Sequence, residues 1–276
     1  ARQQARLLLP VPYFLITFTL PDYLRTWVRS HPKLGYDLLF AASSQALQDL
    51  AGDPKRLGAQ LGMLGVLHTW SRTLIFHPHI HYLIPGGGLS LDERTWIASG
   101  PKFFLHHRPL ALRFRTLFGE KLKKQAPELH AQIPKKIWTQ RWNINLEAAG
   151  SGENALRYLA RYVFKTATAN RPVPLLPNGK VRWTFRSSQT RRWTQIDLTP
   201  QELIGRFVQH VLPPSYCRVR CFGWFHPAAK VRLNRVRALL RLTPVLSGAQ
   251  KQAWQIPAGL LPAEPPPLPE RPPPPA

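Results

Sequence analysis

Two histidines separated by one residue are the first candidates for chemistry in this chain. His79 and His81 lie in 76–85, where apolar residues follow the histidines and Gly86-Gly87-Gly88 ends the run. This pattern predicts a β-strand. Successive side chains of a strand point to opposite faces, so both imidazoles share one face, about 7 Å apart at their backbones, and Ile80 points to the other. Two such imidazoles can converge on one divalent ion.

A third protein ligand has to come from elsewhere in the chain. His77 shares the face by parity, but four residues of strand place it about 13 Å from His81. Glu147, at the end of a later predicted strand, is the candidate oxygen donor. Five other histidines are expected in the core or on the surface rather than as ligands: His68, His106, His107, His130 and His210.

Two tyrosines four residues apart are the second candidates. Tyr158 and Tyr162 lie in a segment predicted as a helix, where a spacing of four places both phenols on one face. Three cations are interleaved with them and can favour the phenolate and hold a scissile phosphate: Arg157, Arg161 and Lys165. The alternative is an amphipathic helix with a tyrosine stripe in the core and cations in solvent.

The two cysteines give a weaker signal. Cys217 and Cys221, with His226, have an unsuitable spacing for zinc and lack a fourth ligand, so we expect structural cysteines. Two cysteines cannot build a disulfide framework, which favours a reducing, cytoplasmic compartment. Fourteen acidic residues in the whole chain argue against a three-carboxylate catalytic site.

Strands and helices alternate around these candidates. The sequence predicts a strand over 13–20, a helix over about 34–50 and a second, glycine-interrupted helix over about 55–70. A basic amphipathic helix over about 109–125 and a strand over 138–146 precede the tyrosine helix.

The region after the tyrosine helix is basic and rich in turns. It predicts a two-strand ribbon containing arginine and tryptophan over 180–186 and 192–198. A helix over about 200–211, a strand over 218–224 and a basic helix over 227–240 follow. We expect three regions: a catalytic core over 1–170, a basic extension over 171–250 and a disordered, proline-rich tail over 251–276.

The charge of the chain points to a polyanionic partner. Lys and Arg number 38 against 14 Asp and Glu, which gives a net charge of +24 and a pI near 11.2. Nucleic acid is the simplest partner, although a ribosomal-type or membrane-surface protein can be equally basic. An apolar content of 44% predicts a real core, and no apolar stretch is long enough to span a bilayer.

The order of the motifs resembles a known family. A strand ending in Thr17-Phe18-Thr19-Leu20, a His-hydrophobe-His strand and a two-tyrosine helix resemble the three motifs of rolling-circle nucleases of the HUH class. More closely, residues 7–240 are similar to the two-tyrosine rolling-circle transposases of bacterial insertion sequences. Four segments carry this resemblance: 66–70 (VLHTW), 77–81 (HPHIH) followed by 85–88 (PGGG), 157–162 (RYLARY) and 209–213 (QHVLP).

The resemblance implies an α+β fold with an HUH-nuclease-like core. An antiparallel sheet flanked by helices would carry the histidine pair on a central strand, with the tyrosine helix packed so that its phenols face the metal. A basic C-terminal extension would follow. Such transposases usually carry an N-terminal cysteine-rich zinc module, and the resemblance places the start of this chain just after it.

The resemblance also implies a reaction and its partners. One tyrosine would attack a phosphate of single-stranded DNA, with Mg²⁺ or Mn²⁺ on His79 and His81, to form a 5′-phosphotyrosine link and a free 3′-hydroxyl. The second tyrosine would cut a second strand. The partners would be single-stranded DNA of element ends and target, with host replication proteins and without a membrane.

Two other functions fit the same residues. A rolling-circle replication initiator or relaxase would use the same chemistry at a plasmid origin. A catalytically dead, truncated remnant would bind DNA with a steep salt dependence but would form no covalent adduct.

Overall fold

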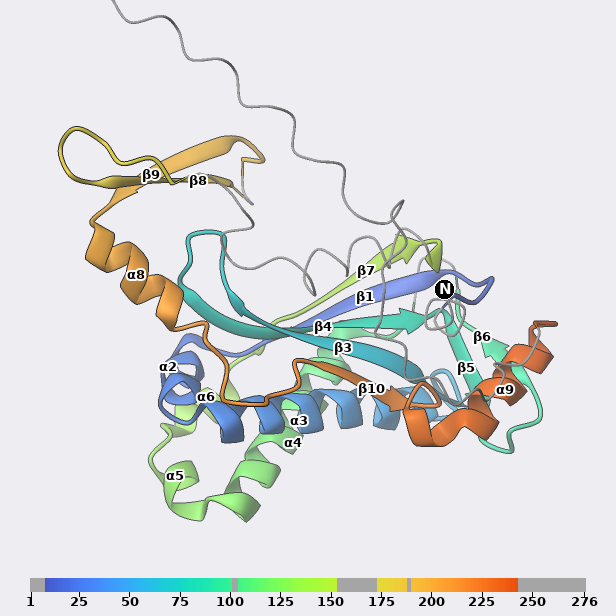
Figure 1. Ribbon diagram of the computed structural model, residues 1–276. Helices are drawn as coiled ribbons and strands as arrows, with labels where there is room; N and C mark the ends of the chain where they lie inside the picture. Colours follow the sequence, from blue (N-terminus) through green and yellow to red (C-terminus); the bar gives the residue numbers. More distant parts are fainter. Residues whose placement is uncertain (1–7, 101–103, 153–172, 188–189, 243–276) are drawn as a thin grey trace, which may run out of the picture.

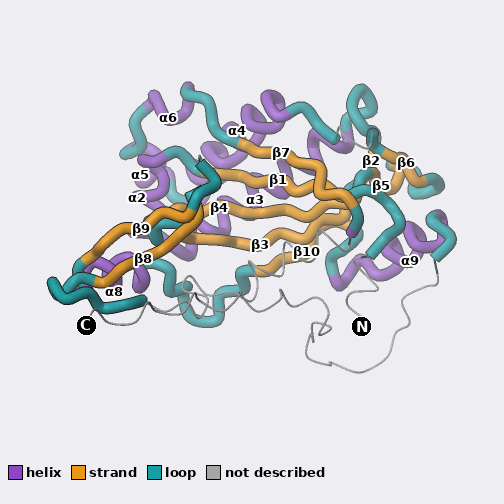
Figure 2. Tube along the Cα trace, turned by 90° about the horizontal axis from the view of Figure 1, so that it is seen from above, coloured by secondary structure: helices purple, strands orange, loops and turns teal. Residues whose placement is uncertain are grey.

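The fold is built around one antiparallel sheet of five strands. The computed structural model of the protein describes residues 8–100, 104–152, 173–187 and 190–242. In these residues the sheet order is β10-β3-β4-β1-β7, and Figure 2 shows the strands side by side. The bounds are β1 Tyr13–Thr19, β3 Gly62–Trp70, β4 Phe76–Pro85, β7 Ile144–Gly150 and β10 Val219–Gly223. The expected α+β class is confirmed, with the histidine strand β4 in the central position.

The two faces of the sheet carry different side chains because residues alternate along each strand. Phe14, Ile16 and Phe18 of β1 point to one face and belong to the main core, together with Ile80 of β4. Thr17 and Thr19 point to the other face, where they lie opposite His81 and His79 in the β1–β4 register. The alternation in β1 and β4 thus separates an apolar face from a face that carries the histidines.

Two long helices cover the apolar face. They are α3 (Pro32–Gly52) and α4 (His107–Gln125), and both lie beneath the sheet in Figure 1. The ring centroids of Phe18 and Phe114 are 5.0 Å apart in an edge-to-face arrangement, which packs α4 on β1. Three shorter helices complete this layer: α2 (Asp22–Ser30), α5 (Pro127–Ala131) and α6 (Lys135–Thr139).

A buried hydroxyl pair joins α3 to the histidine strand. The side chain of Tyr82 is fully buried, and its hydroxyl lies 2.9 Å from Oγ of Ser43. We expect Ser43→Ala to lower the free energy of unfolding by about 1–3 kcal/mol, because it removes the nearest hydrogen-bond partner of the buried Tyr82 hydroxyl. Urea denaturation measures this loss. The matched control is Ser30→Ala at the exposed end of α2, which should change the free energy of unfolding by less than about 0.5 kcal/mol.

The structure corrects the helix predicted over about 55–70. Residues 59–60 form the short strand β2 (Ala59–Gln60), and 62–70 form β3. Because β3 is buried on both faces, its apolar residues run on without the alternation that marks a half-buried strand. Gly65 lies against the Tyr82 ring, and a Cβ at this position would be 2.7 Å from it. The glycine therefore marks a close approach between strands and not an interrupted helix.

The strand predicted over 138–146 begins later than expected. Residues 135–139 are helical, and β7 starts only at Ile144. The cause is Trp142, whose buried ring packs between Phe114 and Phe118 while its Nε1 donates to the carbonyl of Ile137 at 3.0 Å. These contacts hold the chain in a turn between α6 and β7.

The predicted elements of the basic region are present. They are β8 (Val181–Arg186), β9 (Trp193–Leu198), α8 (Pro200–Val208), the strand β10 and, after the 3₁₀ turn η1 (Pro227–Ala229), α9 (Lys230–Leu239). A small sheet of β2, β5 (Gly87–Ser90) and β6 (Trp96–Ala98) lies at one end of the molecule. Strand β10 pairs with β3, so part of the predicted extension belongs to the central sheet.

Two predicted segments, the tyrosine helix and the proline-rich tail over 251–276, lie outside the described residues. Among the helices that the structure does describe, none combines the length and apolar character needed to cross a membrane.

Candidate metal centre

Three buried histidines gather on the face of the sheet opposite α3 and α4. His68 on β3 lies directly across from His79 on β4, and His81 follows two residues along β4 on the same face. Their side chains are only 7%, 8% and 6% exposed, respectively. One ring nitrogen from each histidine lies within 4.8 Å of the other two. A group of this size could hold one metal ion.

The hydrogen bonds of His79 determine which of its nitrogens can bind a metal. Its Nδ1 lies 2.5 Å from the carbonyl oxygen of His77. A carbonyl only accepts, so Nδ1 carries the hydrogen and Nε2 presents its lone pair. This Nε2 lies 3.1 Å from Nδ1 of His68. Two atoms that each lie about 2.1 Å from one ion, at a right angle, are about 3 Å apart, so the pair is spaced as two adjacent ligands.

Thr17 of β1 orients the third histidine. Its Oγ1 lies 2.8 Å from Nδ1 of His81. When Nδ1 donates to this hydroxyl, Nε2 of His81 presents a lone pair, as in many metal sites where an outer partner fixes the tautomer of a ligand. Strands β3 and β4 therefore supply the three candidate ligands, and the neighbouring strand β1 supplies the group that orients His81.

We expect Thr17→Val to weaken metal binding by about 10–100-fold, because valine keeps the shape of threonine but cannot accept the hydrogen of His81 Nδ1. Titration calorimetry with Mn²⁺ measures the affinity. The matched control is Thr19→Val, which makes the same change on the same strand and face, beside His79 in register. Equal affinities for Thr17→Val and the native protein would contradict the orienting role.

Burial keeps the three imidazoles neutral. It lowers the pKa of His81 to about 4. Burial also lowers the pKa of His68 and His79 well below the usual value, and each is lowered further by the neighbouring imidazoles. Only a neutral imidazole can coordinate a metal, so the site is in its binding form at neutral pH.

The structure places the other predicted site residues as follows. Glu147 lies on β7, two strands away from β4 and in register with Leu15 of β1, where its carboxylate accepts from Asn145 at 2.7 Å. That is about 10 Å across the sheet from β4, so Glu147 is not part of the three-histidine group. Tyr158, Tyr162 and the cations predicted beside them, Arg157, Arg161 and Lys165, lie outside the described residues.

His68 is the residue that sequence reasoning missed. The sequence predicts it as a core or surface residue, whereas the structure places it beside both predicted ligands. The error follows from the helix predicted for this segment, since a helix gives no reason to place His68 against His79. A strand over 62–70, paired antiparallel with the histidine strand, would have brought the two residues together.

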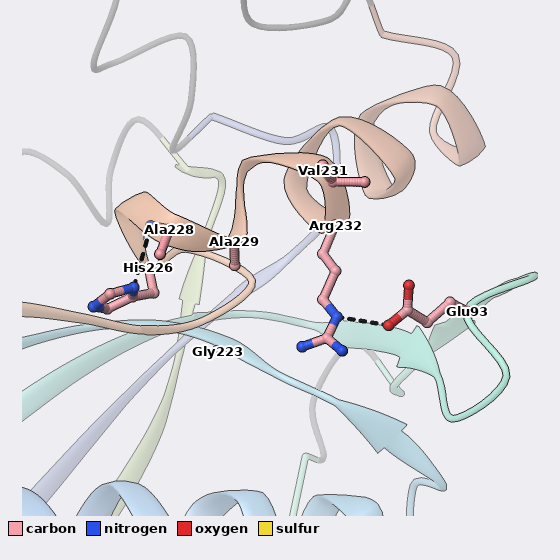
Figure 3. Close-up of a pocket in the computed structure, with 7 residues that line it drawn as sticks. All are labelled: Glu93, Gly223, His226, Ala228, Ala229, Val231 and Arg232. Atoms are coloured by element: carbon pink, nitrogen blue, oxygen red, sulfur yellow. Dashed lines mark hydrogen bonds and ion pairs between the residues drawn. The ribbon is translucent and has the colours of Figure 1, made fainter.

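A separate hollow of about 490 Å³ lies near the other end of β3. It is lined by residues of β10, η1 and α9 and by Glu93, and Figure 3 shows Arg232 Nε bound to the Glu93 carboxylate at 2.6 Å. Gly223 in its wall pairs with Gly62, at the start of β3, whereas His68 lies near the end. None of the three histidines lines this hollow.

Comparison with known proteins assigns the chain to a family. The family model Y2_Tnp, described as "Putative transposase", matches residues 62–232, from the first residue of β3 into α9. The chain belongs to this transposase family.

Two curated relatives are similar over most of the chain. It is 34% identical to "Putative transposase y4qJ" of Sinorhizobium fredii over 79% of its length. It is 30% identical to the transposase for insertion sequence element IS801 of Pseudomonas savastanoi pv. phaseolicola over 77% of its length. The chain spans 59% and 54% of the lengths of these two relatives. No solved structure matches the chain significantly.

Proposed function

We propose that this chain nicks and rejoins single-stranded DNA in the rolling-circle transposition of an insertion sequence, through a covalent 5′-phosphotyrosine link. The strongest support is the three-histidine group on the central strands of a Y2_Tnp family chain. The net charge of +24 suits a DNA substrate. In this proposal the protein works on element ends and target DNA in the bacterial cytoplasm, at the nucleoid, together with host replication proteins.

His68, His79 and His81 would hold one divalent ion. When bound, this ion supplies positive charge that neutralises and orients the scissile phosphate. We propose Mg²⁺ or Mn²⁺, and because imidazole ligands suit transition metals better than Mg²⁺, Mn²⁺ is the ion to test first.

The proposed nucleophile is the phenolate oxygen of Tyr158 or Tyr162. It attacks phosphorus while the bond to the 3′-oxygen breaks, and the departing 3′-oxygen takes a proton to become a hydroxyl. One phosphodiester bond is exchanged for another, so no ATP is needed. In the reverse step a 3′-hydroxyl attacks the phosphotyrosine and releases the tyrosine. Arg157, Arg161 and Lys165 are proposed to contact phosphate during these steps.

The second tyrosine lets the same protein cut a second strand while the first link persists. The free 3′-hydroxyl of one cut strand can then attack the phosphotyrosine link of the other, which joins a donor end to a target. This is the property that separates strand transfer from simple nicking.

A polarity-sensitive adduct assay tests the proposal. The protein is incubated with Mn²⁺ and single-stranded oligonucleotides tiled across the DNA that flanks its gene, and the products are separated under denaturing conditions. An oligonucleotide labelled at its 3′ end should give a labelled protein band. The same oligonucleotide labelled at its 5′ end should give only a shorter free strand. No adduct with any oligonucleotide, or an adduct that carries the 5′ label, would contradict the proposal.

A further inference from the structure

The β8–β9 ribbon has two chemically different faces. Residues directly opposite each other in the antiparallel register share a face. Val181, Trp183 and Leu198 are on the inner face, where they form a small core with Leu74. The outer face of the ribbon consists of three cross-strand pairs: Arg182 with Asp197, Thr184 with Gln195, and Arg186 with Trp193.

The outer face is exposed and polar. Trp193 is 64% exposed, and Gln195 and Asp197 are also exposed. Arg182 binds both carboxylate oxygens of Asp197, at 2.8 and 2.9 Å. The Gln195 amide makes no side-chain hydrogen bond within the described residues. The outer face therefore presents a row of hydrogen-bonding groups to solvent.

The surroundings of this face are positively charged. The stretch 173–211, of which 188–189 are not described, holds six cations and two acids. The cations are Lys180, Arg182, Arg186, Arg191, Arg192 and Arg206, and the acids are Asp197 and Glu202. One acid is already bound to Arg182 and the other to Arg206. The excess charge fits a polyanion.

The ribbon is attached to the turn that joins β3 and β4, the two strands that carry the three histidines. Three consecutive backbone carbonyls of this β3–β4 turn accept hydrogen bonds. One donor belongs to the ribbon, one to α8 and one to the segment that follows α8. Nε1 of Trp183 donates to Arg72 at 2.9 Å, a guanidinium nitrogen of Arg206 to Thr73 at 2.8 Å, and Nε2 of His210 to Leu74 at 3.0 Å.

These bonds hold the ribbon against the β3–β4 turn, on the histidine side of the sheet. Leu74 is fully buried with a positive φ of 61°, a conformation that leucine adopts only under constraint. Arg72 is four residues beyond His68, which is at most about 13 Å of extended chain. The ribbon rises on the side of the sheet opposite α3 and α4, which is the side of the histidines (Figure 1).

We propose that the outer face of the ribbon reads base edges in the major groove of double-stranded DNA next to the strand that is cut. The inference rests on the proposed function only in taking DNA as the substrate. A two-stranded ribbon fits the major groove, which is about 12 Å wide. Gln195 can bind adenine through two hydrogen bonds and Arg186 can bind guanine, while the surrounding cations contact phosphates.

The arrangement suits a duplex better than a single strand. Surfaces that bind single strands stack successive bases on several aromatic rings. The outer face has one ring, that of Trp193, beside two pairs of hydrogen-bonding side chains. Two-stranded β-ribbons that present hydrogen-bonding side chains are one of the known structures that bind in the major groove and contact base edges.

Selection from a randomised library tests this inference. The probe is a pool of duplexes with a central randomised segment, bound in EDTA so that no strand is cut. The native protein should enrich a short sequence motif. Gln195→Ala should reduce the preference for at least one base pair of that motif by roughly tenfold or more. The matched control is Gln125→Ala at the exposed end of α4, behind the sheet, which should enrich the native motif.

Three outcomes would overturn the inference: no motif with the native protein, an unchanged motif with Gln195→Ala, or stronger enrichment from the same pool in single-stranded form. Thermal melting of both variants verifies that they are folded. Because selection is done without metal, it is independent of the adduct assay. A motif without any adduct would leave this inference standing and reject the proposed function, and an adduct without a motif would do the reverse.

Discussion

Replacing His68 with alanine is expected to abolish Mn²⁺-dependent formation of the DNA adduct. His68 contributes one of the three nitrogens that lie within 4.8 Å of one another. Without it, two imidazoles remain and the ion is held more weakly. We expect Mn²⁺ affinity and the adduct rate each to fall by at least about 100-fold, which corresponds to a few kcal/mol. Calorimetry measures the affinity, and denaturing electrophoresis measures the rate.

The matched control for this variant is His77→Ala. His77 lies on the same strand with its ring centroid 5.2 Å from that of His79, yet it is not part of the three-histidine group. Its own role is to accept from His79 through its backbone carbonyl, which the substitution keeps. His77→Ala should therefore retain most of the Mn²⁺ affinity. If it loses as much as His68→Ala, or if His68→Ala loses nothing, the three-histidine site is wrong.

Combined replacement of Tyr158 and Tyr162 with phenylalanine is expected to eliminate the covalent adduct entirely. Phenylalanine keeps the ring but has no oxygen to attack phosphorus, so no slower route through the same residue remains. A single variant that lacks the tyrosine acting first should fail to form the first link. A single variant that lacks the other tyrosine should still form an adduct with one strand. Neither single variant should complete transfer between two strands. Gel assays with one and with two labelled oligonucleotides separate these results.

Tyr23→Phe is the control for the tyrosine variants. Tyr23 is 44% exposed on α2, and within the described residues its hydroxyl makes one long hydrogen bond, at 3.3 Å, to the carbonyl of Gln132. Its loss should leave the adduct unchanged. An adduct that persists in the double variant would show that another group attacks the phosphate. An intact Mn²⁺ site in that variant would confirm that binding and attack are separate roles.

The local pattern was sufficient for the histidine strand. His79 and His81 alternate with Ile80, and the structure places the first two on one face and Ile80 in the core of the other. The same rule applies to β8 and β9, where one face is apolar and the other mostly polar, so the period of two is visible in the residue types. Strand β1 carries buried apolar side chains on both faces, and its aromatic and β-branched residues correctly predicted it instead.

His68 shows where the alternation rule fails. Strand β3 is buried on both faces, so its residues show no alternation and its glycines suggested an interrupted helix. Glu147 shows a complementary difference: the sequence predicts it at the end of a strand beside the site, whereas it lies within β7, two strands away from β4. Register and strand order depend on contacts between segments far apart in the chain, which no local pattern records.

The sequence by itself determined the pair His79 and His81, the tyrosine pair as candidates, the basic character and the family resemblance. Each of these depends on residue type and short spacing. Only the tertiary structure decided that His68 completes the group, that Thr17 orients His81, and that the ribbon is bound to the turn between β3 and β4. These relations arise from antiparallel pairing and from contacts between residues 11, 64 and 111 positions apart in the chain, because hydrogen bonds and packing act through distance in space and not along the sequence.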